Sequence, residues 1–187
     1  MKKLVYLFVP TLILAISAFA PVVGKLVSKS GHISFYSHTA VEDITANNYK
    51  VVSTIDPATG EVVFSVPMQS FEFEKALMQE HYNSKDFLNT KAFPKAKFTG
   101  KISNLSTVDF SKDGIYEANV DGELTIKETA KQVSTKGSVT VKGTSVTVDT
   151  KFNISLADYG ISFKKGKPST NIAKDIEIRV HAEHQPE

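Results

Sequence analysis

The feature that most constrains the fold of this chain is a long succession of short segments in which apolar and polar residues alternate. In "GHISFYSH", Ile33 and Phe35 alternate with polar or amphipathic neighbours, and "EVVFSVPM" and "DIEIRVHAE" show the same period of two. This period is typical of β-strands that bury one face. Turn sequences such as "DPATGE" and "SKDG" separate the runs. The pattern predicts an all-β protein.

The number of strands and the absence of clear edge protection bear on how the sheet is arranged. We count about eight runs, several of them long and rich in Val and Thr, as in "QVSTKGSVTVKGTSVTVDTKFNISL". No pattern of Pro or Lys blunts two exposed edges, and closing a sheet into a barrel removes its edges altogether. We therefore predict a closed eight-stranded antiparallel barrel, with a two-sheet sandwich as the alternative.

One segment, "FEFEKALMQEHYN", changes from a strand pattern to a helical one. We predict a helix over 74–83, inside a helical insertion of about residues 74–91. Just before it, the apolar positions of "VVFSVPM" and those of "FEF" have opposite parity. A β-bulge near Ser70 would account for the shift, and the alternative is that the strand ends at Pro67.

His81 is the residue of this helix that most invites a functional hypothesis. Leu77 and His81 are four residues apart, as are Met78 and Tyr82, so the four form one face of the helix. We expect this face to pack on the barrel, with His81 near the helix C-terminus, where the helix dipole favours an imidazolium. Three roles remain open for His81: a structural residue, a polar contact to a lipid head group, or a general acid or base.

The first residues resemble a secretory signal peptide. Lys2 and Lys3 precede an apolar run, and small residues follow at Ala18 and Ala20. We predict a signal peptide over 1–20, cleaved somewhere within 17–24, followed by one domain over 25–187. A membrane span is the alternative, but the apolar run is short and contains a proline. After cleavage we expect a soluble protein with no integral membrane span.

Composition argues against several classes of partner and chemistry. Removing the leader takes two lysines from the 22 basic residues, so 22 − 2 = 20 remain against 20 acidic ones. A near-neutral domain without a basic cluster is not expected to bind nucleic acid. The chain has no cysteine, which excludes disulfides, a Cys-His catalytic pair and a lipid-modified N-terminal cysteine.

Motifs for catalysis or metal binding are also missing from the sequence. There is no Gly-x-Ser-x-Gly, no His-Glu-x-x-His and no glycine-rich phosphate loop. His32 and His38 lie six residues apart on one predicted strand, which separates them by ~20 Å. His181 and His184 lie near the C-terminus, where we expect an exposed tail. We predict no enzyme activity, no metal site and no cofactor.

Several short motifs together resemble the YceI-like family of lipocalin-like, polyisoprenoid-binding proteins. They are the "SFEF" strand end, "LMQEH" in the helix, "FPKAKFTG" leading into a strand, and the later "GELTI" and "SLADYGISF". The likeness extends from Gly31 to Ala182. One departure follows "GELTI", where the family usually has His-Gly and this chain has Lys127 and Glu128. A tight glycine turn, and any head-group contact of that histidine, are therefore in doubt here.

The resemblance implies an eight-stranded barrel whose cavity holds a polyisoprenoid or other long-chain lipid. We predict a role in transport or storage outside the cytoplasm, in the periplasm or after secretion. The alternative is a protein-interaction or stress-response module with a packed barrel and no lipid. The oligomeric state stays open, a homodimer included. The predicted ligand-binding residues are Phe35, Phe64, Val66, Phe71, Phe73, Leu77, Met78, His81, Phe87, Phe98, Ile102, Leu124, Ile126, Phe152, Ile154 and Tyr159.

Overall fold

The structure is a computed structural model that describes residues 24–161 and 171–187. The predicted signal peptide and its cleavage site lie outside these residues. Within them, no helix is long and apolar enough to cross a membrane.

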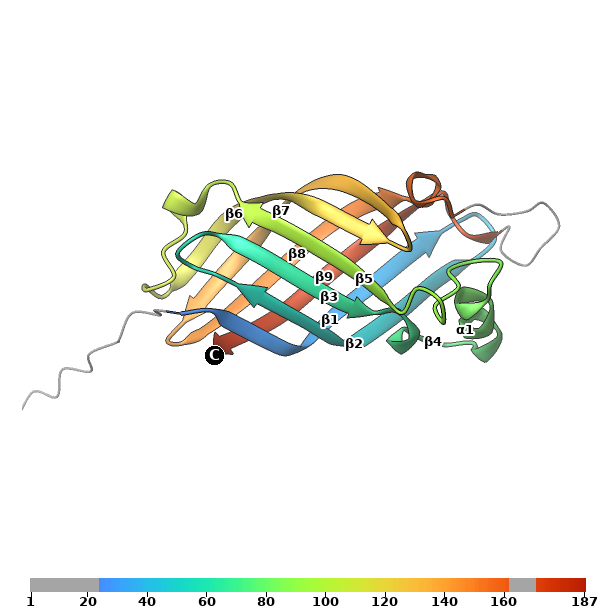
Figure 1. The fold of residues 1–187 in the computed structure, drawn as a ribbon, viewed down its shortest axis with the longest axis horizontal. Coiled ribbons are helices and arrows are strands. Elements are labelled where there is room, and N and C mark those ends of the chain that lie inside the picture. The colour runs from blue at the N-terminus through green and yellow to red at the C-terminus, as the bar shows by residue number, and fades with distance from the viewer. Residues whose placement is uncertain (1–23, 162–170) are drawn as a thin grey trace, which may run out of the picture.

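The chain forms a closed antiparallel barrel with a short helical insertion at one end (Figure 1). Its strands are β1 (Leu26–His38), β2 (Asp43–Ile55), β3 (Glu61–Pro67), β4 (Glu72–Phe73), β5 (Lys95–Ile102), β6 (Gly114–Ile126), β7 (Thr129–Lys142), β8 (Ser145–Ser155) and β9 (Asp175–Pro186). The remaining elements are helix α1 (Ala76–Asn83) and the short 3₁₀ turns η1 (Met68–Ser70), η2 (Leu105–Thr107) and η3 (Leu156–Tyr159).

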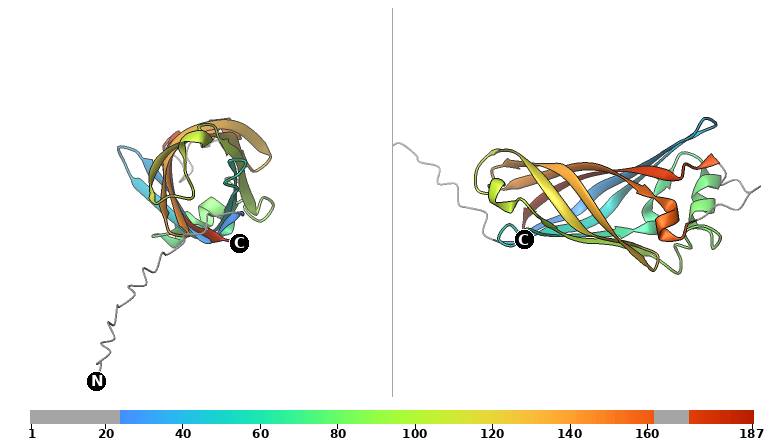
Figure 2. Two further views of the ribbon diagram at one scale, coloured as in Figure 1. Left: turned by 90° about the vertical axis from the view of Figure 1, so that its left-hand side faces the viewer. Right: turned by 90° about the horizontal axis from the view of Figure 1, so that it is seen from above.

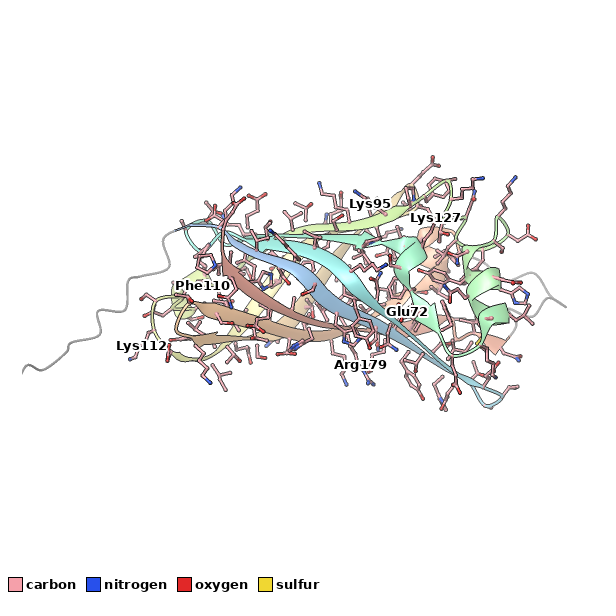
Figure 3. The ribbon with its side chains drawn as sticks, turned by 90° about the horizontal axis from the view of Figure 1, so that it is seen from below. Glu72, Lys95, Phe110, Lys112, Lys127 and Arg179 are labelled. Carbon is pink, nitrogen blue, oxygen red and sulfur yellow. The ribbon has the colours of Figure 1, made fainter. Side chains whose placement is uncertain are left out.

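The order of the strands in space confirms the predicted eight-stranded antiparallel barrel. Neighbouring strands follow the order β1-β9-β8-β7-β6-β5-β3-β2, and pairing of β2 with β1 closes the ring seen in Figure 2. The two-residue strand β4 is an addition that pairs only with β2. Charged side chains such as Lys95, Lys112 and Arg179 stand on the outer surface (Figure 3). The alternation in the sequence therefore reflects one face toward the barrel interior and one toward solvent.

The predicted β-bulge near Ser70 is wrong, and the alternative is what the structure shows. β3 ends at Pro67, and the turn η1 follows it directly. The N–H of Met68 donates to the carbonyl oxygen of Pro94 over 2.8 Å, which fixes the chain as it leaves the strand. The turn changes the parity of the side chains, so that Met68 and Phe71 are both buried.

The helix is shorter at its start than predicted, because β4 uses the residues before it. Phe73 and Glu72 pair with Ala46 and Asn47 of β2, so the chain is still extended there. Lys75 is also extended, with φ −106° and ψ 121°, and helix α1 begins at Ala76. It ends at Asn83, as predicted.

The prediction of an exposed C-terminal tail is wrong, because β9 continues to Pro186 and pairs on both sides. His184 lies opposite Val146 of β8 and has no exposed surface. Its Nε2 is 2.8 Å from the hydroxyl oxygen of Ser53. His181 is in the same strand but faces outward, with its Nδ1 2.7 Å from a carboxylate oxygen of Asp149.

Two clusters of buried apolar residues occupy the two ends of the barrel. The cluster at the end farther from α1 includes Leu26, Ile55, Val146 and Phe110. The other lies under α1 and includes Met68, Phe71, Tyr82 and Leu88. Residues of both clusters line one cavity, and Phe64 packs against both.

Candidate functional site

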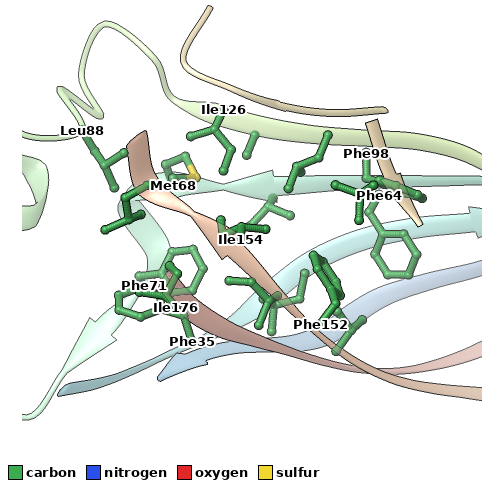
Figure 4. Close-up of a pocket in the computed structure, with 18 of the residues that line it drawn as sticks. Phe35, Phe64, Met68, Phe71, Leu88, Phe98, Ile126, Phe152, Ile154 and Ile176 are labelled. Atoms are coloured by element: carbon green, nitrogen blue, oxygen red, sulfur yellow. The ribbon is translucent and has the colours of Figure 1, made fainter. Parts of the chain in front are cut away.

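A cavity of about 780 Å³ lies inside the barrel and extends to the rim near α1. Side chains of strands far apart in the sequence converge on it, among them Phe35, Phe64, Phe98 and Phe152 (Figure 4). Its size is within the range of about 300–1,000 Å³ that is usual for ligand sites, and an apolar lining is usual too. The packed interior required by the interaction-module alternative is therefore not present.

The structure places every predicted site residue except Tyr159 on the wall or rim of this cavity. The lining residues are Phe35, Phe64, Val66, Phe71, Phe73, Leu77, Met78, His81, Phe87, Phe98, Ile102, Leu124, Ile126, Phe152 and Ile154. Tyr159 belongs to the turn η3 and is buried in the core cluster under α1. Burial raises the pKa of Tyr159 to about 12, so its phenol is neutral. That the lining residues bind a ligand stays a prediction.

Sequence reasoning missed several lining residues. Met68, Val62, Ile176, Ile178 and Val180 share their strand faces with predicted residues or with each other, and strand parity alone could have identified most of them. Leu88, in the loop after α1, had no comparable signal. Tyr82 lies on the helix face that was expected to pack on the barrel, but it was not included among the predicted ligand-binding residues.

The position of Phe98 depends on two glycines opposite each other in β5 and β6. Gly100 pairs with Gly122, and a Cβ built on either would lie about 2.6 Å from the ring of Phe98. The ring therefore lies over the bare backbone of both strands. Substitution of either glycine would push this ring out of its place in the cavity wall.

Tyr82 closes the part of the cavity that lies under α1. Its ring is 5.0 Å from that of Phe73 and 5.9 Å from that of Phe35, measured between centroids. Only 5% of the residue is exposed, and its hydroxyl lies 3.9 Å from the sulfur of Met68. Burial raises the pKa of the Tyr82 phenol well above its usual range. The uncharged ring of Tyr82 therefore closes this part of the cavity.

His81 lies at the rim of the cavity. Its main-chain carbonyl oxygen accepts hydrogen bonds from the hydroxyl of Ser84 at 2.7 Å and from the N–H of Ser84 at 3.2 Å. Lys75 and Glu42 also line the cavity, and Lys75 donates a hydrogen bond of 2.6 Å to Glu42, which raises the pKa of the Lys75 ammonium. The rim thus combines polar groups with the exposed side chain of Leu77, whereas the interior is mostly apolar. The head-group role of His81 stays a prediction.

The turn between β6 and β7 is tight although it lacks the glycine usual in the resembling family. Ile126 pairs with Thr129, so Lys127 and Glu128 alone make the turn. Lys127 adopts the left-handed conformation, with φ 57°. Its ammonium donates to the carbonyl oxygen of Phe87 over 3.2 Å, which ties the turn to the loop after α1.

The fold and the cavity together define a lipocalin-like β-barrel with an apolar interior. The model of the YceI-like domain matches residues 24–184. The chain therefore belongs to the YceI-like family, as its motifs predicted.

Solved structures with the same fold have low sequence identity to this chain. A polyisoprenoid-binding domain from Saccharophagus degradans has a TM-score of 0.75 at 12% identity, covering 88% of this chain and 99% of that one. BcnA from Burkholderia cenocepacia has a TM-score of 0.68 at 21% identity, covering 82% of this chain and 95% of that one. The YCEI protein of Campylobacter jejuni has a TM-score of 0.62 at 16% identity, covering 80% of this chain and 89% of that one. No curated protein matches the sequence. At these identities the likeness establishes the fold.

Proposed function

We propose that the protein binds a long-chain apolar lipid, a polyisoprenoid or a quinone-like molecule, inside its barrel. The observation that carries the proposal is the cavity of about 780 Å³, whose lining is mostly Phe, Ile, Leu and Val side chains. At roughly 30 Å³ for each water-sized group, such a space accommodates about 25 methylene-sized groups. That is on the order of five isoprene units.

The energetics of such a site require no reacting group. Each methylene transferred from water contributes about 0.8 kcal/mol, so a few isoprene units provide a large gross stabilisation. Ordering a flexible chain and losing its free motion reduce that gain. Micromolar binding needs about 8 kcal/mol in total, which leaves a wide margin. The proposed activity is therefore binding, without catalysis.

Two further observations support this choice of ligand and a location outside the cytoplasm. One structural neighbour is described as a polyisoprenoid-binding domain, and its whole length aligns with this barrel. The leader over residues 1–20 has the pattern of a secretory signal. We propose that the protein carries or stores its lipid in the periplasm or after secretion.

The test is to identify what the protein carries when it is purified without detergent. Organic extraction followed by mass spectrometry should recover a long-chain lipid in near-stoichiometric amount. Delipidated protein should then gain thermal stability when geranylgeraniol is added, because a ligand that binds only the folded state stabilises it. Protein that yields no lipid and is not stabilised by any isoprenoid would contradict the proposal.

A further inference from the structure

The barrel wall is interrupted on one side, between β7 and β8. The two strands pair from Lys142 and Ser145 at their hairpin to Gly137 and Thr150, and the pairing stops there. Residues 129–136 of β7 and 151–155 of β8 continue as strands, paired only with β6 and β9 on their other sides. In Figure 2 the end of the β6–β7 hairpin turns away from β8. Within residues 24–161 and 171–187, no strand pairing joins the edges of these two segments, which face each other across this opening.

A second divergence in the wall, between β2 and β3, shows by contrast what a filled opening looks like. There β4 supplies the missing pairs to β2, and the side-chain amide of Asn48 donates to the carbonyl oxygen of Pro67 at 2.8 Å. Between β7 and β8, no strand within residues 24–161 and 171–187 takes that place. The turn η3 contacts β7 and limits the opening on the side of α1.

The residues that line the cavity show that it passes through the wall at this point. Val139 and Val148 are a facing pair that points inward, so Ser138 and Asp149, the next pair, point outward. Ser138 and Asp149 nevertheless line the same cavity as the inward residues. A groove on the outer surface also includes Asp149 and Thr150. We call the opening bounded by Thr135, Ser138, Asp149 and Thr150 the side window.

Two inward-facing hydroxyls lie on the inner edge of the side window. The hydroxyl of Thr150 donates to the carbonyl oxygen of Lys136 at 2.8 Å, in place of a ladder hydrogen bond. The hydroxyl oxygens of Thr135 and Thr150 are 2.9 Å apart. With the Thr150 proton on Lys136, the Thr135 hydroxyl has two acceptors for its own proton, the Thr150 oxygen and, at 3.3 Å, the carbonyl oxygen of Lys136. Because each hydroxyl has one proton and two lone pairs, the pair has no proton left to donate and keeps lone pairs that accept.

Charged groups near the side window already have partners. Asp149 contacts His181, Lys151 contacts Glu177 at 3.3 Å, and Lys136 is 3.4 Å from Glu117. This balance offers little to an ionic head group and leaves the hydroxyl pair as the polar feature of the window's inner edge.

We propose that the side window is a second opening of the cavity, and that Thr135 and Thr150 accept a hydrogen bond there from a hydroxyl group of the lipid. The ligand class is an isoprenoid alcohol or hydroquinone, whose chain runs from the window toward α1. A ketone or ether, which has no proton to donate, gains no such bond. The proposal rests on the proposed lipid-binding function and specifies where the polar end lies.

The experiment compares geranylgeraniol with its methyl ether, which has the same chain but no donor. We expect the alcohol to bind about fivefold more tightly, the usual effect of one net hydrogen bond. Thr150→Val should remove this preference by weakening the alcohol alone, and Thr135→Val should do the same. Thr147→Val, on the outward face of the same strand, is the matched control and should change neither affinity.

A second measurement tests the window without relying on the threonine variants. The chain has no cysteine, so Ser138→Cys introduces a single thiol at the outer edge of the window. Bound geranylgeraniol should slow its reaction with a water-soluble maleimide, and should not slow the reaction of Thr147→Cys.

The outcomes separate this proposal from the function on which it rests. Equal affinities for alcohol and ether in the wild-type protein, with no protection at position 138, would overturn the window while lipid binding stands. A loss of preference confined to His81→Gln would place the hydroxyl at the α1 rim and also overturn it. Failure of both compounds to bind any variant would instead contradict lipid binding itself.

Discussion

Leu77 offers a direct test of whether lipid reaches the rim of the cavity at α1. The residue lies in α1 and lines the cavity, yet it remains 60% exposed. An exposed leucine at the edge of an apolar cavity is expected to gain burial when a lipid chain lies against it. We therefore predict that Leu77→Lys weakens binding of geranylgeraniol without destabilising the protein.

The magnitude follows from the area that remains to be covered. Full burial of a leucine side chain contributes about 1.5–3 kcal/mol, so covering the exposed 60% contributes on the order of 1 kcal/mol. The dissociation constant should rise about five- to tenfold, because the lysine also places a charge beside the chain. Displacement of a fluorescent apolar probe measures this change.

A matched control variant separates ligand contact from a general effect of added charge. Ile115 is also exposed, at 77%, but it belongs to β6 far from α1 and does not line the cavity. Ile115→Lys should leave the affinity unchanged, and both variants should keep the wild-type urea midpoint, since exposed substitutions change stability by about 0.5 kcal/mol or less. Equal affinities for the two lysine variants would refute a lipid contact at this rim.

Two further predictions concern buried residues. Tyr82→Ala should lower the free energy of unfolding by about 3 kcal/mol in urea titrations, because it removes a buried aromatic ring. Tyr82→Phe keeps the ring and should lower it by less than about 1 kcal/mol. Similar losses for both variants would contradict the role of the Tyr82 ring in closing the cavity. Burial lowers the pKa of His184 in the folded state, so the unfolded chain takes up a proton first as the pH falls below about 6.5. The free energy of unfolding should then fall with decreasing pH by up to about 1.4 kcal/mol per pH unit. His184→Gln should remove this part of the pH dependence. Identical pH dependence in the wild-type protein and the variant would show that His184 is not held neutral.

The parts of the structure that sequence predicted well are those fixed by local alternation. Strand parity placed Phe35, Phe64, Phe98 and Phe152 inside the barrel, because each residue of a strand faces opposite to the next. The same rule also places Met68 on the face of Phe64 and Val66, but it gives the wrong face for Phe71, which follows the turn η1. Parity thus predicts the wall of the cavity and fails where the chain leaves a strand.

Features that depend on contacts between distant segments were beyond the sequence. His184 reads as part of a polar tail, but pairing of β9 with β1 and β8 buries it against Ser53, 131 residues earlier. Tyr159 was predicted as a ligand contact because it is a large aromatic residue, but the turn η3 directs it into the core under α1. In both cases contacts with segments distant in the sequence decide the environment of the side chain, and a single sequence does not identify those segments.

The side window also depends on contacts between strands, so it was not predictable from the sequence alone. Gly137 lets β7 approach β8 closely, since a Cβ there would lie 2.7 Å from the carbonyl oxygen of Asp149. At the next position the Thr150 hydroxyl takes the carbonyl oxygen of Lys136, so the main-chain ladder has lost an acceptor. Competition of a threonine side chain with the backbone is a local event, but its result is an opening only because β7 is held by β6 and β8 by β9. The barrel therefore stays closed as a whole while one seam opens, and this seam connects the apolar interior with solvent.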